Sequence, residues 1–188
     1  MILSDADIER YLRNGMLRID GLHEDAIQPA SVDVTLGAGF LVPQGHTEIC
    51  PYVVPVELDD IRMVPSPHDD FLVLPPQGFA LGTTEEVVRL PSHIGAQVDG
   101  RSSTGRRGIT VHITAGWIDP GFEGHITLEL VNHNPFAVVL RAGQPICQLK
   151  FMMTFTPSRR PYGHESRRSR YQHQRGVTAA RPKADLAP

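Results

Sequence analysis

The sequence predicts an all-β fold, a sandwich, a jelly roll or a barrel, preceded by one short helix. Three observations support this prediction: apolar and polar residues alternate with a period of two, the alternating runs are short, and turn-forming residues are frequent, with 17 Gly and 16 Pro among 188 residues. Short strands separated by turns, without helical patterns between them, are typical of antiparallel β domains. The length fits one domain with a terminal extension.

The predicted helix covers residues 5–14. Ser4 and Asp7 have the spacing of a capping box, and the apolar residues that follow fall on one helical face. Gly15 suits the position directly after a helix end. We expect this helix to cover one end of a sheet.

The predicted strands begin where the period changes to two. Val32, Val34 and Leu36 alternate with polar residues. Turn signals rich in Pro and Gly separate the later strands. These strands are expected at residues 39–42, 71–74, 78–84, 94–99, 108–113, 124–132, 136–141 and 145–156. The proline-rich segment 51–70 is expected to be a long loop or arm.

The charge is distributed unevenly along the chain. Residues 157–188 hold eight Lys and Arg and two acids, a net charge of +6, so the remaining residues carry −9 of the total of −3. A basic tail on an acidic body has three interpretations: a solvated tail, an arm that binds nucleic acid, or a flap that meets a polyanion. Charge alone favours the solvated tail.

Cysteine usage and targeting signals predict a cytoplasmic protein without membrane partners. Cys50 and Cys147 match no metal-binding spacing and are expected to be reduced thiols. The N-terminus lacks the basic and apolar regions of a signal peptide. No apolar run approaches the length of a membrane span.

The segment Gly100-Arg-Ser-Ser-Thr-Gly-Arg-Arg-Gly108 combines small residues, hydroxyl groups and three guanidinium groups. Glycines let backbone amides approach a ligand closely, and arginines donate paired hydrogen bonds to phosphate oxygens. The segment therefore predicts a phosphate-binding loop. The alternative is a polar surface loop, because short motifs recur by chance.

The segment from Thr114 to Val131 contains the second candidate. One face of strand 124–132 is aliphatic, and the other face carries His125, Thr127, Glu129, Val131 and His133. If the aliphatic face is core, Glu129 points to solvent or into a pocket between subunits. In such a pocket it can act as a general acid and base.

A metal site was weighed for His112, His125, Glu129 and His133. The paired H-x-H of many jelly-roll metal proteins is missing, and so is the zinc deaminase signature. We therefore expect no protein-bound metal and no zinc.

Four segments together resemble the motifs of the dUTPase superfamily, in order. They are Gln28–Gly37 with Asp33, Gly100–Arg106, Ala115–Gly124 and Gly143–Leu149. The resemblance spans residues 1–175, and four ordered motifs are far more specific than one. It implies a distorted jelly-roll or β-barrel of the dUTPase-like type, with a short N-terminal helix and a C-terminal flap.

Two features resemble the dCTP deaminase branch of this superfamily. One is Thr127-Leu-Glu129 after the third motif, and the other is the stretch from Pro161-Tyr-Gly163 to Gln174. The resemblance implies a nucleotide hydrolase domain at residues 1–160, with a basic flap and mobile tail at 161–188. A phosphate-covering flap then becomes the favoured interpretation of the basic tail. The implied activity is hydrolysis of dCTP to dUMP, and the alternatives are a deaminase that stops at dUTP or a plain dUTPase.

The resemblance also implies roles for individual residues. The implied catalytic residues are Glu129, Ser102, Arg106 and Ala115. Substrate contacts are implied for Arg101, Ser102, Ser103, Thr104, Gly105, Arg106, Asp119, Thr127, Gln148, Tyr162, Arg170 and Gln174. Formation of dUMP is implied by Gly116 and Trp117. Mg²⁺ would arrive with the triphosphate, and the implied partners are dCTP, dUTP, dTTP as an inhibitor and two further copies of the chain in a homotrimer, with no nucleic acid.

Three residues depart from the pattern of the family. Thr104 and Arg107 stand where leucine is common, and this could alter the packing of the phosphate loop. Arg170 replaces the commoner lysine and keeps its charge but not its geometry.

Overall fold

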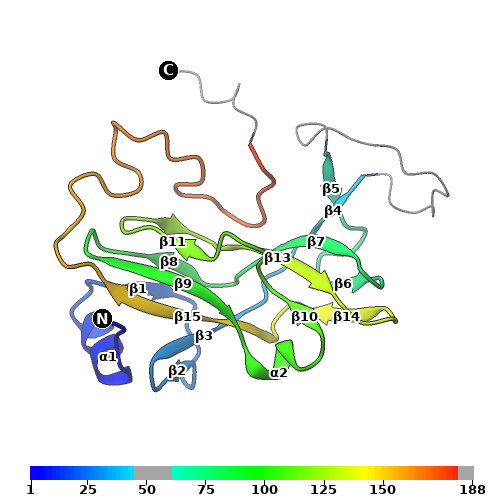
Figure 1. Cartoon of the computed structure of the whole chain (residues 1–188), viewed down its shortest axis with the longest axis horizontal. Coiled ribbons are helices and arrows are strands. Elements are labelled where there is room, and N and C mark those ends of the chain that lie inside the picture. The colour runs from blue at the N-terminus through cyan, green and yellow to red at the C-terminus, as the bar shows by residue number, and fades with distance from the viewer. Residues whose placement is uncertain (45–60, 182–188) are drawn as a thin grey trace.

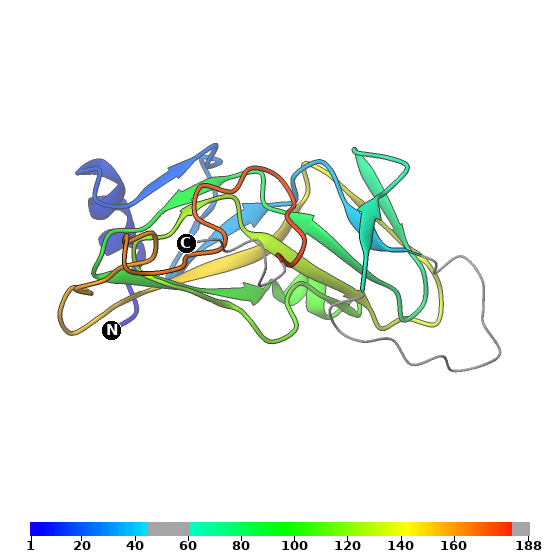
Figure 2. The same cartoon turned by 90° about the horizontal axis from the view of Figure 1, so that it is seen from above.

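The computed structural model describes residues 1–44 and 61–181. Within these residues the strands form four antiparallel sheets, which close into a distorted barrel (Figures 1 and 2). The predicted all-β fold is therefore confirmed. Cys50, the first part of the predicted loop 51–70 and the end of the predicted mobile tail lie outside the described residues.

Two large sheets carry the motifs. One has the order β10 (Ile109–Thr110), β13 (Thr127–Asn132), β7 (Phe79–Thr83), β4 (Leu41–Pro43) and β5 (Met63–Pro65). The other has the order β11 (Trp117–Ile118), β9 (Ile94–Gly100), β15 (Pro145–Met153), β3 (Ser31–Thr35) and β2 (Ile27–Gln28).

Two smaller sheets complete the described part of the barrel. The three-stranded sheet contains β1 (Arg18–Asp20), β8 (Val87–Arg89) and β12 (Glu123–Gly124) in that order. The two-stranded sheet pairs β14 (Val138–Arg141) with β6 (Phe71–Leu74).

The helix α1 (Asp5–Arg13) agrees with the prediction for residues 5–14. The Ser4 side chain accepts a hydrogen bond from the Asp7 amide, and the Asp7 carboxylate bonds back to Ser4, which forms the expected capping box. Ile8 and Tyr11 are buried against the barrel, and Gly15 follows with a φ of 72°. The helix thus covers one end of the barrel, as predicted.

Several predicted strands are shorter than expected: strand 136–141 begins at Val138 and strand 145–156 ends at Met153. Strand 108–113 ends at Thr110, because the Ile113 amide donates to a side chain instead of continuing the ladder. Strand 124–132 is divided into β12 and β13, because Gly124 adopts a φ of 151° that redirects the chain. The single-turn helix α2 (Ser102–Gly105) and the short strands β1, β2, β5, β8 and β11 were not predicted.

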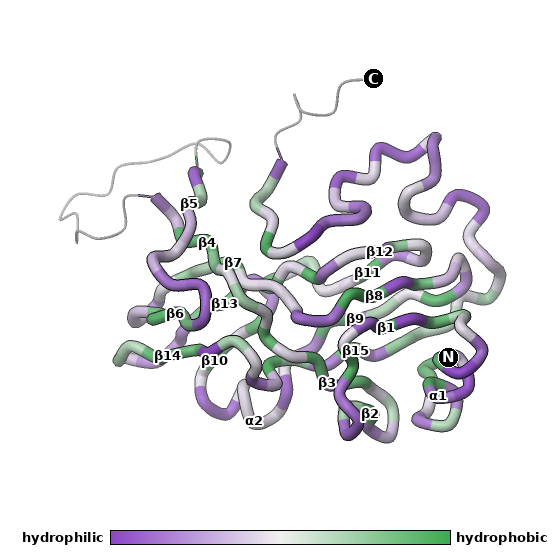
Figure 3. Tube along the Cα trace, turned by 180° about the vertical axis from the view of Figure 1, so that it is seen from behind, coloured by the Kyte–Doolittle hydropathy of each residue, from purple (hydrophilic) through white to green (hydrophobic). Residues whose placement is uncertain are grey.

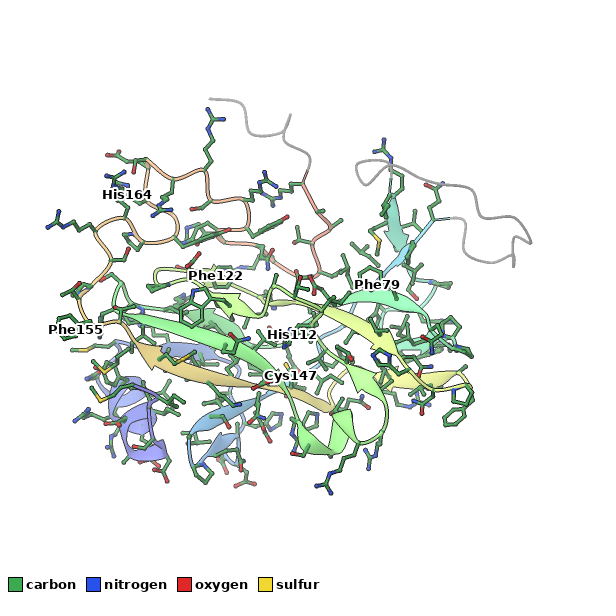
Figure 4. The ribbon with its side chains drawn as sticks, viewed as in Figure 1. Phe79, His112, Phe122, Cys147, Phe155 and His164 are labelled. Carbon is green, nitrogen blue, oxygen red and sulfur yellow. The ribbon has the colours of Figure 1, made fainter. Side chains whose placement is uncertain are left out.

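The ionisable side chains of Glu86 and Cys147 are buried in the interior. The register of β15 against β3 shifts between Pro145 and Cys147, next to Thr35 of β3. The Thr35 amide donates to both oxygens of the Glu86 carboxylate, each at 3.0 Å. Burial raises the pKa of Glu86, although the bond from Thr35 acts in the opposite direction. Cys147 is free and buried, and burial raises the pKa of its thiol (Figure 4).

We expect Glu86→Gln to flatten the dependence of stability on pH. Because the folded-state pKa of Glu86 is raised, its contribution to stability is complete below the unfolded value of about 4.3 and is lost as pH rises through the folded value. Urea denaturation at about pH 5 and pH 8 measures this loss, which should be smaller in Glu86→Gln than in the parent. The exposed Glu165, which is not among the groups that shift the pKa of Glu86, supplies the control Glu165→Gln. Equal pH dependence in Glu86→Gln and the parent would contradict the interpretation.

Candidate active site

The strand β13 separates a buried aliphatic face from a half-buried polar face. Leu128 and Leu130 are fully buried, whereas Thr127, Glu129 and Val131 are half-buried. This alternation confirms the predicted division of the strand into two faces. Glu129 therefore points away from the core.

The Glu129 side chain is held by the backbone on its open side. Its Oε2 atom accepts a hydrogen bond from the Ile113 amide at 2.6 Å, while its own amide donates to the Val111 carbonyl at 3.0 Å. A carboxylate has about four lone-pair positions, so most of its accepting capacity remains available for water or a substrate proton. The arrangement suits a positioned acid–base group.

The predicted phosphate loop forms the single turn α2 at the end of β9. Ser102, Ser103 and Arg106 are exposed, whereas Thr104 is buried beneath the turn. The first amides of a helical turn have no intrahelical acceptor and are available to a bound anion. The turn thus presents hydroxyl, amide and guanidinium groups on one exposed loop.

An ion pair fixes the start of this loop. Arg101 Nε lies 2.9 Å from Asp33 Oδ2, and Arg101 Nη1 donates to the Pro145 carbonyl at 3.3 Å. Asp33, Arg101 and Pro145 also line a groove of about 600 Å³. The first, second and fourth motifs therefore meet at one guanidinium group.

The Gln148 side chain connects the same three motifs. Its Oε1 accepts from Ser31 Oγ at 2.8 Å, and its Nε2 donates to the Gly100 carbonyl at 3.0 Å. The Gln148 amide thus supports the loop that begins at Arg101, and one N–H group and one oxygen lone pair remain for other partners. The role of Gln148 as a substrate contact stays a prediction.

The third motif packs a tryptophan over a glycine. Trp117 Nε1 donates to Asp119 Oδ1 at 3.1 Å, and a side chain at Gly95 would lie 2.3 Å from the indole ring. Gly116 is equally confined, because a Cβ there would lie 2.3 Å from Gln97 Nε2. Ala115, directly before it, is exposed.

The C-terminal segment returns to the barrel beside this motif. Tyr162 donates its amide to the Pro120 carbonyl at 2.8 Å, and its ring lies 5.8 Å from that of Phe122 (Figure 4). Burial raises the pKa of the Tyr162 hydroxyl, which accepts from the Tyr171 amide at 2.9 Å. The Arg170 carbonyl accepts from Arg181.

Gln174 is the member of this segment that reaches β13. Its Nε2 donates to the His125 carbonyl at 2.6 Å and lies 3.4 Å from Thr127 Oγ1. The structure thus brings Gln174 and Thr127 together, as their shared predicted role requires.

Glu129 and the phosphate loop are attached to β13 at different points. The His133 amide donates to the Gly108 carbonyl at 2.9 Å, and His133 lies about 13 Å beyond Glu129 along an extended strand. Among residues 1–44 and 61–181 of one chain, no hydrogen bond joins Glu129 to Ser102, Arg106 or Ala115.

The hydrogen bond from the Ile113 amide to Glu129 was not predicted from the sequence, because every residue except proline has a backbone amide that can donate. The contacts of Gln172, His173 and Glu123, which hold the C-terminal segment, were not predicted either.

Within the described residues, no group of three or more His, Cys, Asp or Glu side chains is arranged to hold a metal ion. None of the described helices has the length and apolar character that a membrane crossing requires.

The motifs agree with a known family. A profile described as dCTP deaminase-like matches residues 2–154. The chain belongs to this family. A Methanosphaera stadtmanae protein described as "dCTP deaminase, dUMP-forming" is 46% identical over 191 residues, with 98% of this chain and 95% of that protein covered. A Streptomyces coelicolor protein of the same description is 44% identical over 183 residues, with 96% and 95% covered.

A solved structure supports the same assignment. The 2'-deoxycytidine 5'-triphosphate deaminase from Agrobacterium tumefaciens matches with a TM-score of 0.60 at 25% identity. The match covers 81% of this chain and 48% of that one, so this chain spans less than half of its length. The predicted family is confirmed, and the fold agrees with that of a solved dCTP deaminase.

We expect Gly95→Ala to displace the indole of Trp117. The added Cβ would lie 2.3 Å from a ring atom, which should cost about 1–3 kcal/mol of stability and break the bond to Asp119. Trp117 is the single tryptophan of the chain, so its fluorescence emission reports the displacement directly.

Gly100→Ala on the same strand is the matched control, because its Cβ would meet only Val111 at 4.0 Å. An emission spectrum of Gly95→Ala identical to that of Gly100→Ala would contradict the proposed packing.

Proposed function

We propose that the protein hydrolyses dCTP to ammonia and dUMP. Its family and the dUMP-forming relatives that match nearly its whole length support this function. The structural observation that carries it is Glu129, a half-buried carboxylate that the Ile113 amide holds on the open face of β13.

In the first step, Glu129 removes a proton from a water molecule near Ser102 and the backbone of Ala115. The resulting hydroxide attacks C4 of cytosine and Glu129 delivers the proton to N3 of the base. Glu129 then transfers the proton of the new C4 hydroxyl group to the amino nitrogen, the C4–N4 bond breaks, and ammonia leaves as the C4 carbonyl forms. The products are dUTP and ammonia, and the carboxylate ends in its starting state. A positioned acid–base group contributes about 10²–10⁴-fold, and Arg106 supplies charge beside the water.

The triphosphate binds on the α2 loop. The contacts come from Arg101 and Arg106, the hydroxyl groups of Ser102 and Ser103, and the backbone of Thr104 and Gly105. Paired guanidinium donors suit phosphate oxygens. Mg²⁺ would enter as part of the substrate complex and would neutralise part of the charge of the triphosphate.

In the second step, water attacks the α-phosphate of dUTP and the bond to the β-phosphate breaks, which gives dUMP and pyrophosphate. Asp119 holds the 3'-hydroxyl group, and Gly116 and Trp117 shape the sugar side of the site. The indole bond to Asp119 supports this assignment, because it orients the carboxylate. Tyr162, Arg170 and Gln174 close the site from the C-terminal segment.

A homotrimer supplies the complete site. Within one chain the segment that follows α2 is bonded to His133 through the Gly108 carbonyl, and His133 lies about 13 Å from Glu129 along an extended chain. A neighbouring copy brings its own loop opposite the carboxylate, and this buries the polar face of β13. Size measurement by light scattering tests the trimer, and dTTP is proposed as an inhibitor of the assembled enzyme.

Product analysis separates the three candidate activities. Incubation with dCTP and Mg²⁺ should yield ammonia, dUMP and pyrophosphate in equal amounts. Accumulation of dUTP would identify a deaminase that stops after the first step. Turnover of dUTP without release of ammonia from dCTP would identify a plain dUTPase and end the role proposed for Glu129.

We expect Glu129→Gln to abolish deamination while nucleotide binding is retained. The amide keeps the shape of the side chain but cannot exchange the proton, so ammonia release should fall by about 10²–10⁴-fold. An ammonia assay measures the rate, and titration with dCTP measures binding. Glu85→Gln, at an exposed turn, is the control and should keep parental activity. Full activity of Glu129→Gln would contradict the role of Glu129 as the group that transfers the proton.

We expect Asp33→Asn to weaken dCTP binding about ten-fold, which corresponds to about 1.4 kcal/mol for a bond to a charged group. The substitution frees Arg101 from the contact that aims it at the phosphate loop. The KM for dCTP should therefore rise. Asp99→Asn, which removes an ion pair with Lys150 outside the loop, is the matched control. A KM equal to that of Asp99→Asn would show that the Asp33 contact does not aim Arg101.

A further inference from the structure

Residues 173–174 pair with β12, the edge strand of the three-stranded sheet, which precedes the Glu129 strand β13 in the chain (β12 is labelled in Figure 3). Gly124 and Gln174 form a parallel bridge. The His173 amide donates to the Glu123 carbonyl at 2.7 Å, and the His125 amide donates to the Gln174 carbonyl at 3.2 Å. The segment therefore extends the sheet by hydrogen bonds from the backbone.

Two glutamine side chains add to this pairing. Gln172 accepts from the Glu123 amide at 3.3 Å and donates to the Gly121 carbonyl at 3.1 Å. Gln174 is 7% exposed and reaches the His125 carbonyl and Thr127. The position of Gln174 beside Thr127 thus depends on docking of the whole segment.

The docked conformation includes an unfavourable backbone geometry. His173 has a φ of 58°, in the left-handed region that side chains with a Cβ rarely adopt. The surrounding contacts must therefore offset this cost. The segment is also largely hydrophilic (Figure 3), so burial of apolar surface contributes little to its docking.

One carboxylate provides the charge for these contacts. Glu123 Oε1 lies 3.0 Å from Arg89 Nε, 3.6 Å from His173 Nδ1 and 4.0 Å from Arg175 Nη2. Partial burial acts to raise the pKa of Glu123, but the bond and charge of Arg89 and the charges of His173 and Arg175 outweigh it and lower the pKa. Glu123 is therefore ionised at neutral pH.

Glu123 also has contacts within the barrel that do not involve the C-terminal segment. Glu123 pairs across the sheet with Arg89 of β8, and Arg89 also lies 3.1 Å from Asp20 of β1. Single exposed ion pairs contribute little, because the side chains lose freedom on pairing. Here the Glu123–Arg89 pair is already ordered, so only His173 and Arg175 must be immobilised.

We propose that Glu123 is a positioning residue that anchors residues 171–175 to β12 and so holds Gln174 in the nucleotide site. This inference rests on the proposed function, in which Gln174 and Thr127 contact nucleotide. When only a fraction of molecules has the segment docked, the apparent affinity falls by that fraction. Saturating nucleotide restores the docked state, so kcat is preserved.

The anchor is tested first without catalysis, by hydrogen exchange of the full chain. Glu123→Gln should accelerate exchange in a peptide covering residues 171–176 and leave the amides of β13 at the parental rate. The matched control is Glu165→Gln, an exposed glutamate of the same C-terminal segment. Unchanged exchange in residues 171–176 of Glu123→Gln overturns the proposal.

Kinetics with dCTP then test the consequence for the site. Glu123→Gln should raise KM about ten-fold and change kcat by less than about two-fold. Arg175→Gln should raise KM less, and the double variant should not exceed Glu123→Gln, because both changes remove one interaction. A lowered kcat with unchanged KM overturns the proposal. If the parent releases no ammonia, the proposed function fails, and the exchange experiment still decides whether Glu123 is the anchor.

Discussion

The pairing of β15 with β3 and β9 is the constraint on which the site depends. This register places the Gln148 amide between Ser31 and the Gly100 carbonyl. Gly100 ends β9, so the same amide determines where the phosphate loop leaves the sheet. Arg101, which follows β9, is then held by the Pro145 carbonyl of the adjacent strand β15 and by Asp33 of β3, the next strand of the same sheet. The pairing of β15 with β3 and β9 thus brings together three motifs that are distant in sequence. The loop that begins at Arg101 is held at its start by these contacts.

Because side chains alternate along β13, one face of the strand packs into the core and the other face carries Glu129. Leu128 and Leu130 fill the core, whereas Thr127 and Glu129 face outward. The Ile113 amide leaves the ladder to bond Glu129, which shortens β10 and at the same time fixes the carboxylate. The local loss of sheet pairing is therefore compensated by a stronger, charge-assisted bond at the site.

The longer elements could be predicted from the sequence, because their patterns repeat. The helix at residues 5–14, the strands β3, β6 and β15, and the two faces of β13 all follow from periodicity and capping. The turn α2 and the strands β8 and β12 are too short to show a period. The Glu123–Arg89 pair joins residues far apart in the chain, and the Ile113–Glu129 bond uses a backbone donor. Neither interaction could therefore be predicted from a local sequence pattern. The four ordered motifs identified the family, whereas the roles of individual site residues are proposals.

The order of elements along the chain has a consequence for synthesis. In the part of the chain that the structure describes, the last strand, β15, ends at Met153, whereas the residues that dock on β12 begin at Tyr171. A ribosome therefore delivers every strand of this barrel before it delivers Gln174, and domains fold as they emerge. A nascent barrel carries Glu129 but lacks Gln174 and its neighbours, for which nucleotide contacts are proposed. With these proposed roles, competence to consume cellular nucleotides is deferred until translation has passed the barrel.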